Sequence, residues 1–163
     1  MNSNVKFKED LKQGNIGERL VAKYLESKGF TIINYGNTSD YDILTLYKGK
    51  EVKFEIKTDL YEYYKKIITN NLFIEVICNN KFSGINSSKA DYFIYLLPNI
   101  DEMYMIKISD LKELLMSRGF RRSSQSGDGG RVIGYLIDRD EAKEWFKVIK
   151  FNNIIKYFTK RDE

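Results

Sequence analysis

The chain has 163 residues, of which 42% are hydrophobic and 14% aromatic, and its net charge is +4. This composition predicts one folded domain over residues 1–163 and excludes a disordered chain. The sequence contains no histidine and one cysteine, Cys78, which excludes Ser-His-Asp and Cys-His nucleophile systems and zinc sites built from Cys and His. Any catalysis must therefore use carboxylates, lysine, tyrosine or serine.

The N-terminal third predicts a helix followed by strands. The helix covers residues 15–28 and ends at Gly29, and a strand follows over residues 31–35. A β-hairpin then covers residues 42–58, with Gly49-Lys50 as a two-residue turn, because glycine supplies the positive φ that tight hairpins need.

The remainder predicts a mixture of strands and helices. Asp138 and Glu141 form a capping-box pattern at the start of a late helix. No apolar run approaches the roughly 20 residues that cross a bilayer, and a single cysteine allows no disulfide within the chain, so we expect a cytoplasmic protein without a membrane anchor. The predicted strands cover residues 71–78, 92–97, 103–108 and 132–137, and the predicted helices cover residues 109–118 and 138–147.

The hairpin carries the most informative residues. Because strand side chains alternate between two faces, Glu55 and Lys57 point away from the face that carries Phe54. With the turn placed as above, Asp42 lies opposite Lys57 and diagonal to Glu55. All three functional groups then share one face, whereas a three-residue turn would send Asp42 to the other.

Two carboxylates at this separation suit Mg²⁺, which binds one or two carboxylates, several waters and a substrate phosphate. A neighbouring lysine can stabilise the developing phosphorane charge or orient the attacking water. Asp42, Glu55 and Lys57 therefore indicate metal-assisted phosphodiester hydrolysis. The alternative is a solvated strand face with an Asp–Lys ion pair across the hairpin.

Asp42 and the run Glu55-Ile56-Lys57 resemble the motif of the PD-(D/E)XK nuclease superfamily, which includes restriction endonucleases, phage and repair exonucleases and archaeal Holliday junction resolvases. Residue 41 is tyrosine where the superfamily name has proline. The upstream stretch over residues 14–20, with Glu18, resembles the first helix of the resolvase branch. The resemblance implies an α/β, restriction-endonuclease-like fold, in which a mixed central sheet is flanked by helices.

The same resemblance implies roles for individual residues. Asp42 and Glu55 would hold Mg²⁺, for which Mn²⁺ can substitute, and Lys57 would activate water. Glu18 would add to the metal site. The residues themselves also allow a structural role for Glu18, because Asn15 and Glu18 have the spacing of a capping box.

Two further segments are candidates for the site. Glu75 interrupts an apolar strand face and is a candidate metal ligand, with a surface position as the alternative. Ser83 and Lys89 lie in a loop whose hydroxyl and ammonium groups suit phosphate contact. The alternative is an ordinary polar loop.

Residues 118–131 form a glycine-rich basic segment that we expect to be a flexible loop closing over a nucleic-acid backbone. A connector with incidental arginines is the alternative. The segment lacks the Gly-Lys-Ser/Thr end of a P-loop, so no nucleotide cofactor is expected. Its candidate nucleic-acid contacts are Arg118, Arg121, Arg122 and Arg131.

Together these features predict a Mg²⁺-dependent DNA endonuclease, with a Holliday junction resolvase of bacterial, archaeal or phage origin, active in DNA recombination or repair, as the first expectation. Such an enzyme would bind branched or duplex DNA as a homodimer, because paired incisions need two active sites. Three alternatives stay open: an exonuclease or restriction-like nuclease, a non-catalytic nucleic-acid-binding module, and a nuclease with an RNA substrate.

Overall fold

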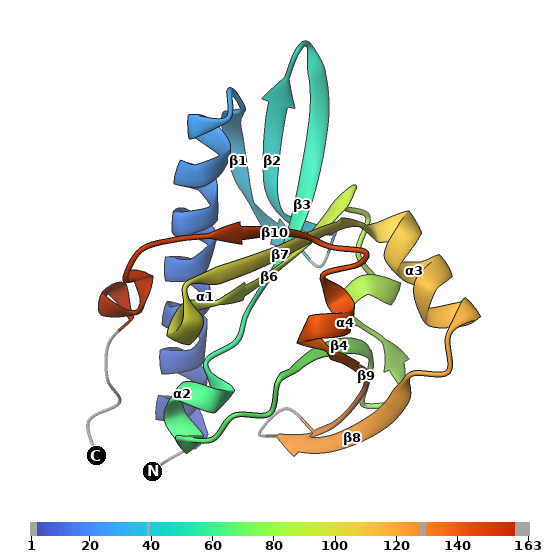
Figure 1. The fold of residues 1–163 in the computed structure, drawn as a ribbon. Helices are drawn as coiled ribbons and strands as arrows, with labels where there is room; N and C mark the ends of the chain where they lie inside the picture. The colour runs from blue at the N-terminus through green and yellow to red at the C-terminus, as the bar shows by residue number, and fades with distance from the viewer. Residues whose placement is uncertain (1–2, 39, 128–129, 159–163) are drawn as a thin grey trace.

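A computed structural model describes residues 3–38, 40–127 and 130–158, which build two β-sheets with the long helix α1 along one side (Figure 1). The larger sheet has the strand order β1-β2-β3-β6-β7-β10, and the smaller has the order β5-β4-β9-β8. The elements are α1 (Ser3–Ser27), β1 (Thr31–Thr38), β2 (Tyr41–Tyr47), β3 (Lys50–Thr58), α2 (Tyr61–Lys65), β4 (Asn71–Cys78), β5 (Lys81–Phe82), β6 (Tyr92–Leu97), β7 (Glu102–Lys107), α3 (Ile108–Ser117), β8 (Arg121–Gly127), β9 (Gly130–Asp138), α4 (Arg139–Ala142) and β10 (Lys147–Lys150).

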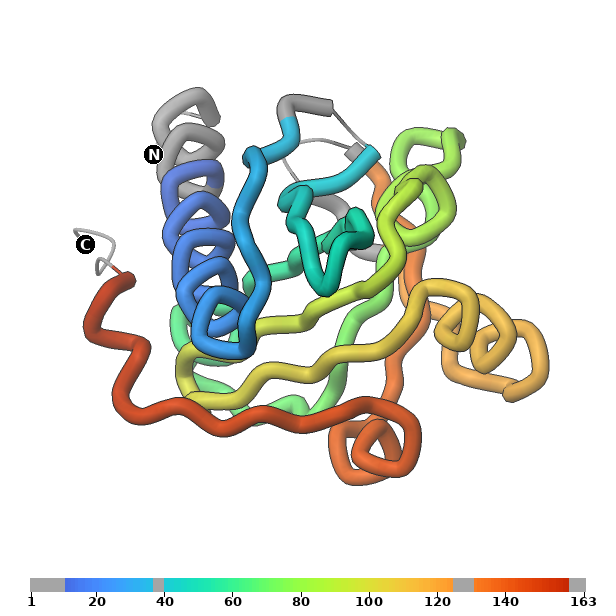
Figure 2. The backbone as a smooth tube through the Cα atoms, turned by 90° about the horizontal axis from the view of Figure 1, so that it is seen from above, coloured from blue at the N-terminus to red at the C-terminus, as the bar shows by residue number. Residues whose placement is uncertain are grey.

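The larger sheet is mixed, because β3 pairs with β6 in parallel while the other strand pairs of this sheet are antiparallel. Helix α1 lies along one face of this sheet, as the view from above shows (Figure 2). The predicted fold class, a mixed central sheet flanked by helices, is therefore confirmed. None of the described helices combines the length and the apolar character needed to span a membrane.

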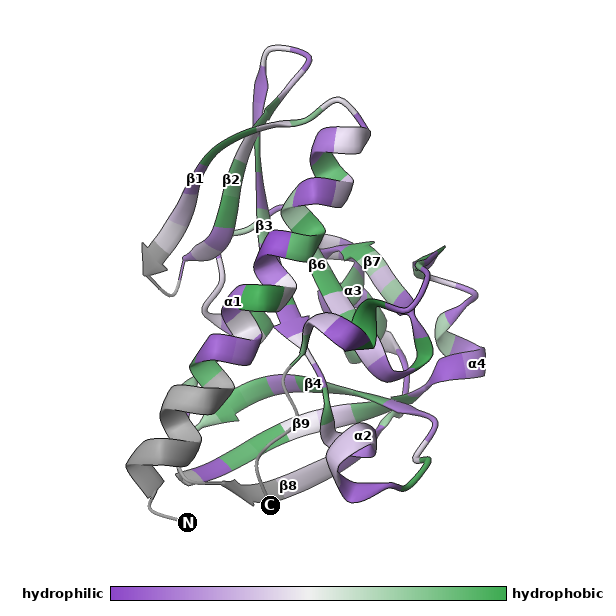
Figure 3. Cartoon of the chain, turned by 90° about the vertical axis from the view of Figure 1, so that its left-hand side faces the viewer, coloured by the Kyte–Doolittle hydropathy of each residue, from purple (hydrophilic) through white to green (hydrophobic). Residues whose placement is uncertain are grey.

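Two hydrophobic clusters hold these layers together. Val21 and Leu25 of α1 pack with Phe54 and Ile94 on one face of the larger sheet. The second cluster joins that sheet to the smaller one and to α3 and α4, and Tyr95 and Tyr104 are its largest fully buried side chains. Figure 3 shows hydrophobic residues along β2, β4 and β6, whereas hydrophobic and hydrophilic residues alternate along α1, as in a helix with one apolar face.

Helix α1 begins well before the predicted start. It includes Asn15 in its interior, so the capping box proposed for Asn15 and Glu18 is wrong. Gly14 does not end the helix, because glycine in a helix interior costs only about 1 kcal/mol relative to alanine. Glu18 therefore needs another explanation than helix capping.

A close contact sets the position of α1 against the sheet. A Cβ atom on Gly17 would lie 1.9 Å from Oγ1 of Thr58, the last residue of β3. Only glycine allows the helix backbone to approach β3 this closely. The approach brings the adjacent Glu18 towards the strand that carries Glu55 and Lys57.

The hairpin turn is Lys48-Gly49 and not Gly49-Lys50, since Tyr47 pairs with Lys50. Both turn residues have positive φ, 48° and 77°, which is the type I′ pattern. The change moves the strand pairing by two residues, so every side chain keeps its predicted face. Continuing this register puts Asp42 opposite Glu55 and diagonal to Lys57, the reverse of the prediction.

The C-terminal half departs from the prediction in two places. Residues 121–127, expected in a flexible loop, form strand β8, which pairs with β9 from Arg121 opposite Leu136 onwards. The loop prediction was wrong because serine and glycine in a sequence indicate a loop, whereas this segment forms a strand by pairing with the largely apolar strand β9. The late helix is capped by Asp138 as predicted, but it ends at Ala142 and is followed by strand β10 along β7.

Candidate functional site

Asp42 and Glu55 lie at the centre of the candidate site, side by side on β2 and β3. The Asp42 carboxylate accepts a hydrogen bond of 2.6 Å from the backbone N–H of Ile56, which fixes its orientation. The Glu55 carboxylate accepts a 2.9 Å hydrogen bond from Ser88 Oγ. Each acid is thus oriented by a hydrogen-bond donor.

The pKa values of the acids are raised by burial and by repulsion between neighbouring carboxylates. Burial, followed by repulsion from Asp42, raises the pKa of Glu18 from 4.5 to about 7. Burial, with repulsion from Asp42, Glu18 and Glu75, also raises the pKa of Glu55 to about 7, against the opposing effect of the Ser88 hydrogen bond. Burial raises the pKa of Asp42 as well, partly offset by the Ile56 N–H. The structure therefore brings the four predicted acids into one electrostatic cluster.

Lys57 is exposed on the same face of β3, two residues beyond Glu55. It shares a pocket of about 190 Å³ with Glu55 and with Phe73 and Glu75 of β4. Ser83 Oγ donates a 2.6 Å hydrogen bond to Glu75 Oε1. Ser83, predicted to contact phosphate, therefore has an internal role in orienting Glu75.

The predicted basic contacts lie in different parts of the molecule. Lys89 forms a 3.1 Å ion pair with Asp40. Arg118 lies over the ring of Trp145, and Arg131 Nε donates to Ser124 Oγ. Arg121 and Arg122 are exposed neighbours on β8 and point to opposite faces of the smaller sheet.

Sequence reasoning missed two features of the site. Ser88 was part of a loop expected to bind phosphate, yet it is buried and also receives a 3.2 Å hydrogen bond from the Ala90 N–H. Its position just before β6, the parallel neighbour of β3, is the signal that could have indicated it. The second feature is a pair of basic residues, Arg19 and Lys23, which line a groove between α1 and β1 together with Glu18. Their i, i+4 spacing places them on one side of α1 and is the signal that could have indicated them.

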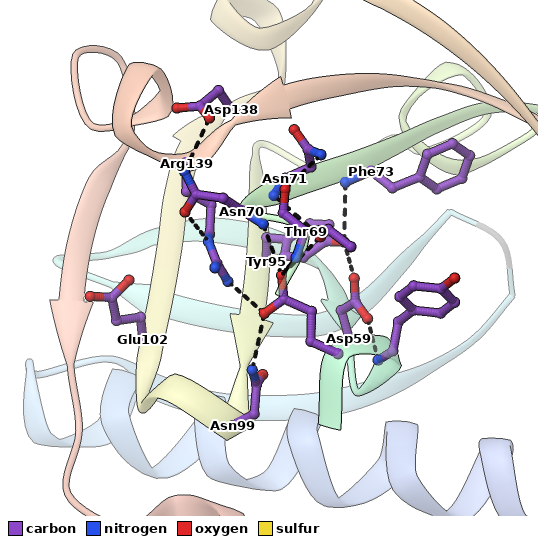
Figure 4. A network of polar contacts seen from close by, with 12 residues as sticks. Asp59, Thr69, Asn70, Asn71, Phe73, Tyr95, Asn99, Glu102, Asp138 and Arg139 are labelled. Atoms are coloured by element: carbon purple, nitrogen blue, oxygen red, sulfur yellow. Dashed lines mark hydrogen bonds and ion pairs between the residues drawn. The ribbon is translucent and has the colours of Figure 1, made fainter. Parts of the chain in front are cut away.

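A buried polar network supports the strand end beside Lys57 (Figure 4). Tyr95 Oη donates a short hydrogen bond to Asp59 and accepts one of 3.2 Å from the Phe73 N–H. Burial and the Asp59 carboxylate raise the pKa of Tyr95 well above its usual value, so its hydroxyl stays a donor. This contact ties β6, the end of β3 and β4 together.

The second part of the network fixes α2. Arg139 Nη1 forms a buried ion pair of 3.0 Å with Glu62, which also accepts hydrogen bonds from Thr69 and Asn70. Burial alone would raise the pKa of Glu62, but these donors outweigh it and hold the pKa below its usual value. Glu62 is therefore a structural acid with its own cation, unlike the acids of the candidate site.

The donor set of the site fits a divalent cation. Within the part of the chain that the structure describes, Glu18, Asp42 and Glu55 make no ion pair with a lysine or arginine. Crowded, half-buried carboxylates of this kind are costly unless a cation compensates them. The described residues include no group of three or more acidic or cysteine side chains arranged to hold a metal by themselves. Mg²⁺ nevertheless binds only one or two carboxylates when waters and a substrate phosphate supply its remaining ligands. Asp42 and Glu55 would provide these two carboxylates.

Comparison with known proteins adds one finding. No family model matches the sequence, and no curated protein matches it. Among solved structures, the bacterial homing endonuclease I-Ssp6803I is similar, with a TM-score of 0.51, 13% sequence identity and an alignment that covers 82% of this chain and 86% of that chain. At this identity the similarity concerns the fold, which is a nuclease-like α/β fold. Membership of the PD-(D/E)XK superfamily and of its resolvase branch stays a prediction.

Proposed function

We propose that the protein is a metal-dependent DNA endonuclease that hydrolyses a phosphodiester bond at Asp42, Glu55 and Lys57. The observation that carries this proposal is the convergence of Glu18, Asp42 and Glu55 from three different elements next to an exposed lysine. The likeness to a homing endonuclease supports it at the level of the fold. The alternative, a solvated strand face with an ion pair across the hairpin, would leave the acids exposed and would not raise their pKa values.

Each residue has a separate task in this mechanism. Asp42 and Glu55 would hold Mg²⁺, and the Ile56 N–H and Ser88 hydroxyl orient them. Mg²⁺, when bound, supplies Lewis-acid activation of water and neutralises phosphate charge. Lys57 would donate to the nonbridging oxygens on which charge develops, at a site already partly shielded from water.

Glu18 and Glu75 would act from the two sides of this pair. Glu18 comes from α1, and its pKa of about 7 describes the metal-free site, in which burial and the neighbouring Asp42 disfavour its charged form. Glu75 is oriented by Ser83 and shares the pocket of Lys57. Neither acid is assigned as a direct metal ligand, because the described residues include no group of three acids arranged to hold one ion.

The preferred DNA geometry is the finer part of the proposal. The helix that carries Glu18 supports a four-way junction resolvase, which would require a dimer to make paired incisions. The fold similarity instead names a homing endonuclease. Both activities would use the same catalytic residues, so the substrate must be determined by assay.

The test is a cleavage panel in Mg²⁺ or EDTA with a four-way junction, linear duplex, nicked duplex and single strand. Lys57→Ala is compared with Lys50→Ala, which removes an exposed lysine from the far end of the same strand. We expect Mg²⁺-dependent cleavage that is lost in Lys57→Ala and kept in Lys50→Ala. Binding without cleavage of any substrate would instead support a nucleic-acid-binding module.

A further inference from the structure

Three hollows of the surface join into one trough that begins at the catalytic residues. The first contains Glu55, Lys57 and Phe73, and the second shares Lys57 and Phe73 with it. The second shares Asn71 and Leu136 with a third hollow, and the third ends at Arg118 and Arg121. The trough therefore runs from the proposed scissile phosphate across one face of the smaller sheet.

The strand pairing explains why these side chains share a face. Phe73 pairs with Leu136, which pairs with Arg121, so the three form one row across β4, β9 and β8. A second row contains Glu75, Gly134 and Ser123. Side chains in such rows project to the same side of a sheet.

The floor of the trough contains the flat ring of Phe73, which lies beside Gly134. A Cβ atom on Gly134 would lie 2.7 Å from Cζ of Phe73, so the absence of a side chain there lets the Phe73 ring lie over β9. The Phe73 backbone is fixed by its hydrogen bond to Tyr95 Oη. An anchored, half-buried aromatic ring is a surface on which an unpaired base can stack.

The trough carries positive groups at both ends, while the proposed catalytic acids Glu55 and Glu75 line its first hollow. Lys57 lies at its start, and Arg121 lies at its far end, exposed and without an ion-pair partner among the described residues. Two acids on its walls are engaged: Asp59 accepts from Tyr95 and from the Tyr61 N–H, and Asp138 caps α4. Glu141 is the remaining acid in the third hollow.

We propose that this trough binds an unpaired strand of nucleic acid that leads away from the scissile phosphate, with Phe73 stacking on a base and Arg121 contacting the backbone. The inference rests on the proposed function, because it takes the acidic cluster as the point of cleavage. A recessed trough suits a single strand, whereas duplexes are usually read by elements that protrude into their grooves. The substrate would therefore be DNA with a single-stranded segment beside the cleavage point.

The experiment measures binding in EDTA, so its result does not depend on cleavage. A fluorescently labelled single-stranded oligonucleotide and a blunt duplex of the same length are titrated with wild type, Arg121→Ala, Arg122→Ala and Phe73→Leu. Arg122→Ala is the matched control, since it removes the same charge one residue away; Arg122 was predicted from the sequence to contact nucleic acid, but it lies on the opposite sheet face and the proposal leaves it out of the interface.

We expect the single strand to bind more tightly than the duplex. Arg121→Ala should weaken single-strand binding roughly fivefold and lower the slope of log K against log salt by about 0.7, the loss of one phosphate contact. Phe73→Leu, which keeps an apolar side chain, should weaken it roughly five- to tenfold through lost stacking. Arg122→Ala should bind like wild type.

Equal effects of Arg121→Ala and Arg122→Ala, or tighter binding of the duplex with the same Arg121 dependence, would overturn the proposal. The two proposals fail separately. Lys57-dependent cleavage with no Arg121-specific loss of binding would remove the trough but leave the nuclease, whereas Arg121-specific binding without any cleavage would remove the nuclease but leave the trough.

Discussion

Replacing Glu55 by glutamine should make the metal-free protein more stable while it removes activity. The folded protein raises the pKa of Glu55 from 4.5 to about 7, chiefly by burial. A group with a raised pKa binds its proton more tightly in the folded state, so folding loses stability as pH rises from 4.5 to about 7. Glutamine resembles the protonated acid and avoids this loss.

The size of the effect follows from the two pKa values. The interval between 4.5 and about 7, converted at about 1.4 kcal/mol per pH unit, gives an upper limit of about 3.5 kcal/mol. Glu55 is only partly buried, and solvent screening lowers the expected gain to about 2 kcal/mol at pH 8. For a domain of this length, that gain corresponds to a rise in Tm of about 4–8 °C.

The assay is thermal unfolding in EDTA at pH 4 and pH 8, with Glu51→Gln as the control. Glu51 is an exposed residue of the same strand and should change Tm little at either pH. Glu55→Gln should match wild type at pH 4, where both states hold the proton, and exceed it at pH 8. An equal Tm at pH 8, or a gain of the same size at both pH values, would refute the burial argument.

Three further predictions follow from the same geometry. Mg²⁺ should raise the Tm of wild type more at pH 8 than at pH 5, because protons compete for the raised-pKa acids, and should leave Glu55→Gln unshifted; a pH-independent rise would point to a different metal site. Gly17→Ala should lower both Tm and cleavage rate, because its Cβ would meet Thr58 at 1.9 Å, while Gly14→Ala, with nothing within 4 Å, should raise Tm slightly; equal behaviour of the two variants would show that the close contact does not position α1. Arg139→Ala should destabilise the fold by about 3–5 kcal/mol in chemical denaturation, because it leaves the Glu62 carboxylate buried and unpaired, and a loss under 1 kcal/mol would contradict this.

The sequence predicted the strands of the core most successfully. The bounds of β4 and β6 agree residue for residue, because both are β-branched or aromatic runs bounded by polar residues or, at the end of β6, by Pro98. The hairpin was placed on the right face even though its turn was misplaced by one residue. A two-residue turn moved by one position changes the pairing by two, which preserves the alternation of side chains.

Tertiary contacts explain the main errors. The full length of α1 is not visible in its apolar pattern, because Gly14 and Asn15 interrupt the sequence signal without ending the helix. Strand β8 was expected to be a loop because its own residues are serine, glycine and arginine. It forms because β9 offers it a complete ladder of backbone partners.

The candidate site was predictable in its acids but not in their surroundings. The E-x-K spacing fixed the shared face of Glu55 and Lys57 from local geometry alone. The contact between Gly17 and Thr58, the hydrogen bond from Ser88 and the trough over Phe73 join residues that are distant in sequence. No periodicity in one chain specifies such contacts.

The central claim is that Asp42 and Glu55 support hydrolysis together with Mg²⁺. The most direct measurement is the single-turnover cleavage rate against Mg²⁺ concentration for wild type, Asp42→Asn and Glu51→Gln. We predict that Asp42→Asn lowers the rate by at least about a hundredfold and shifts its Mg²⁺ dependence to higher concentration, whereas Glu51→Gln follows wild type. Cleavage by Asp42→Asn at the wild-type rate, or cleavage by wild type in EDTA, would contradict the account.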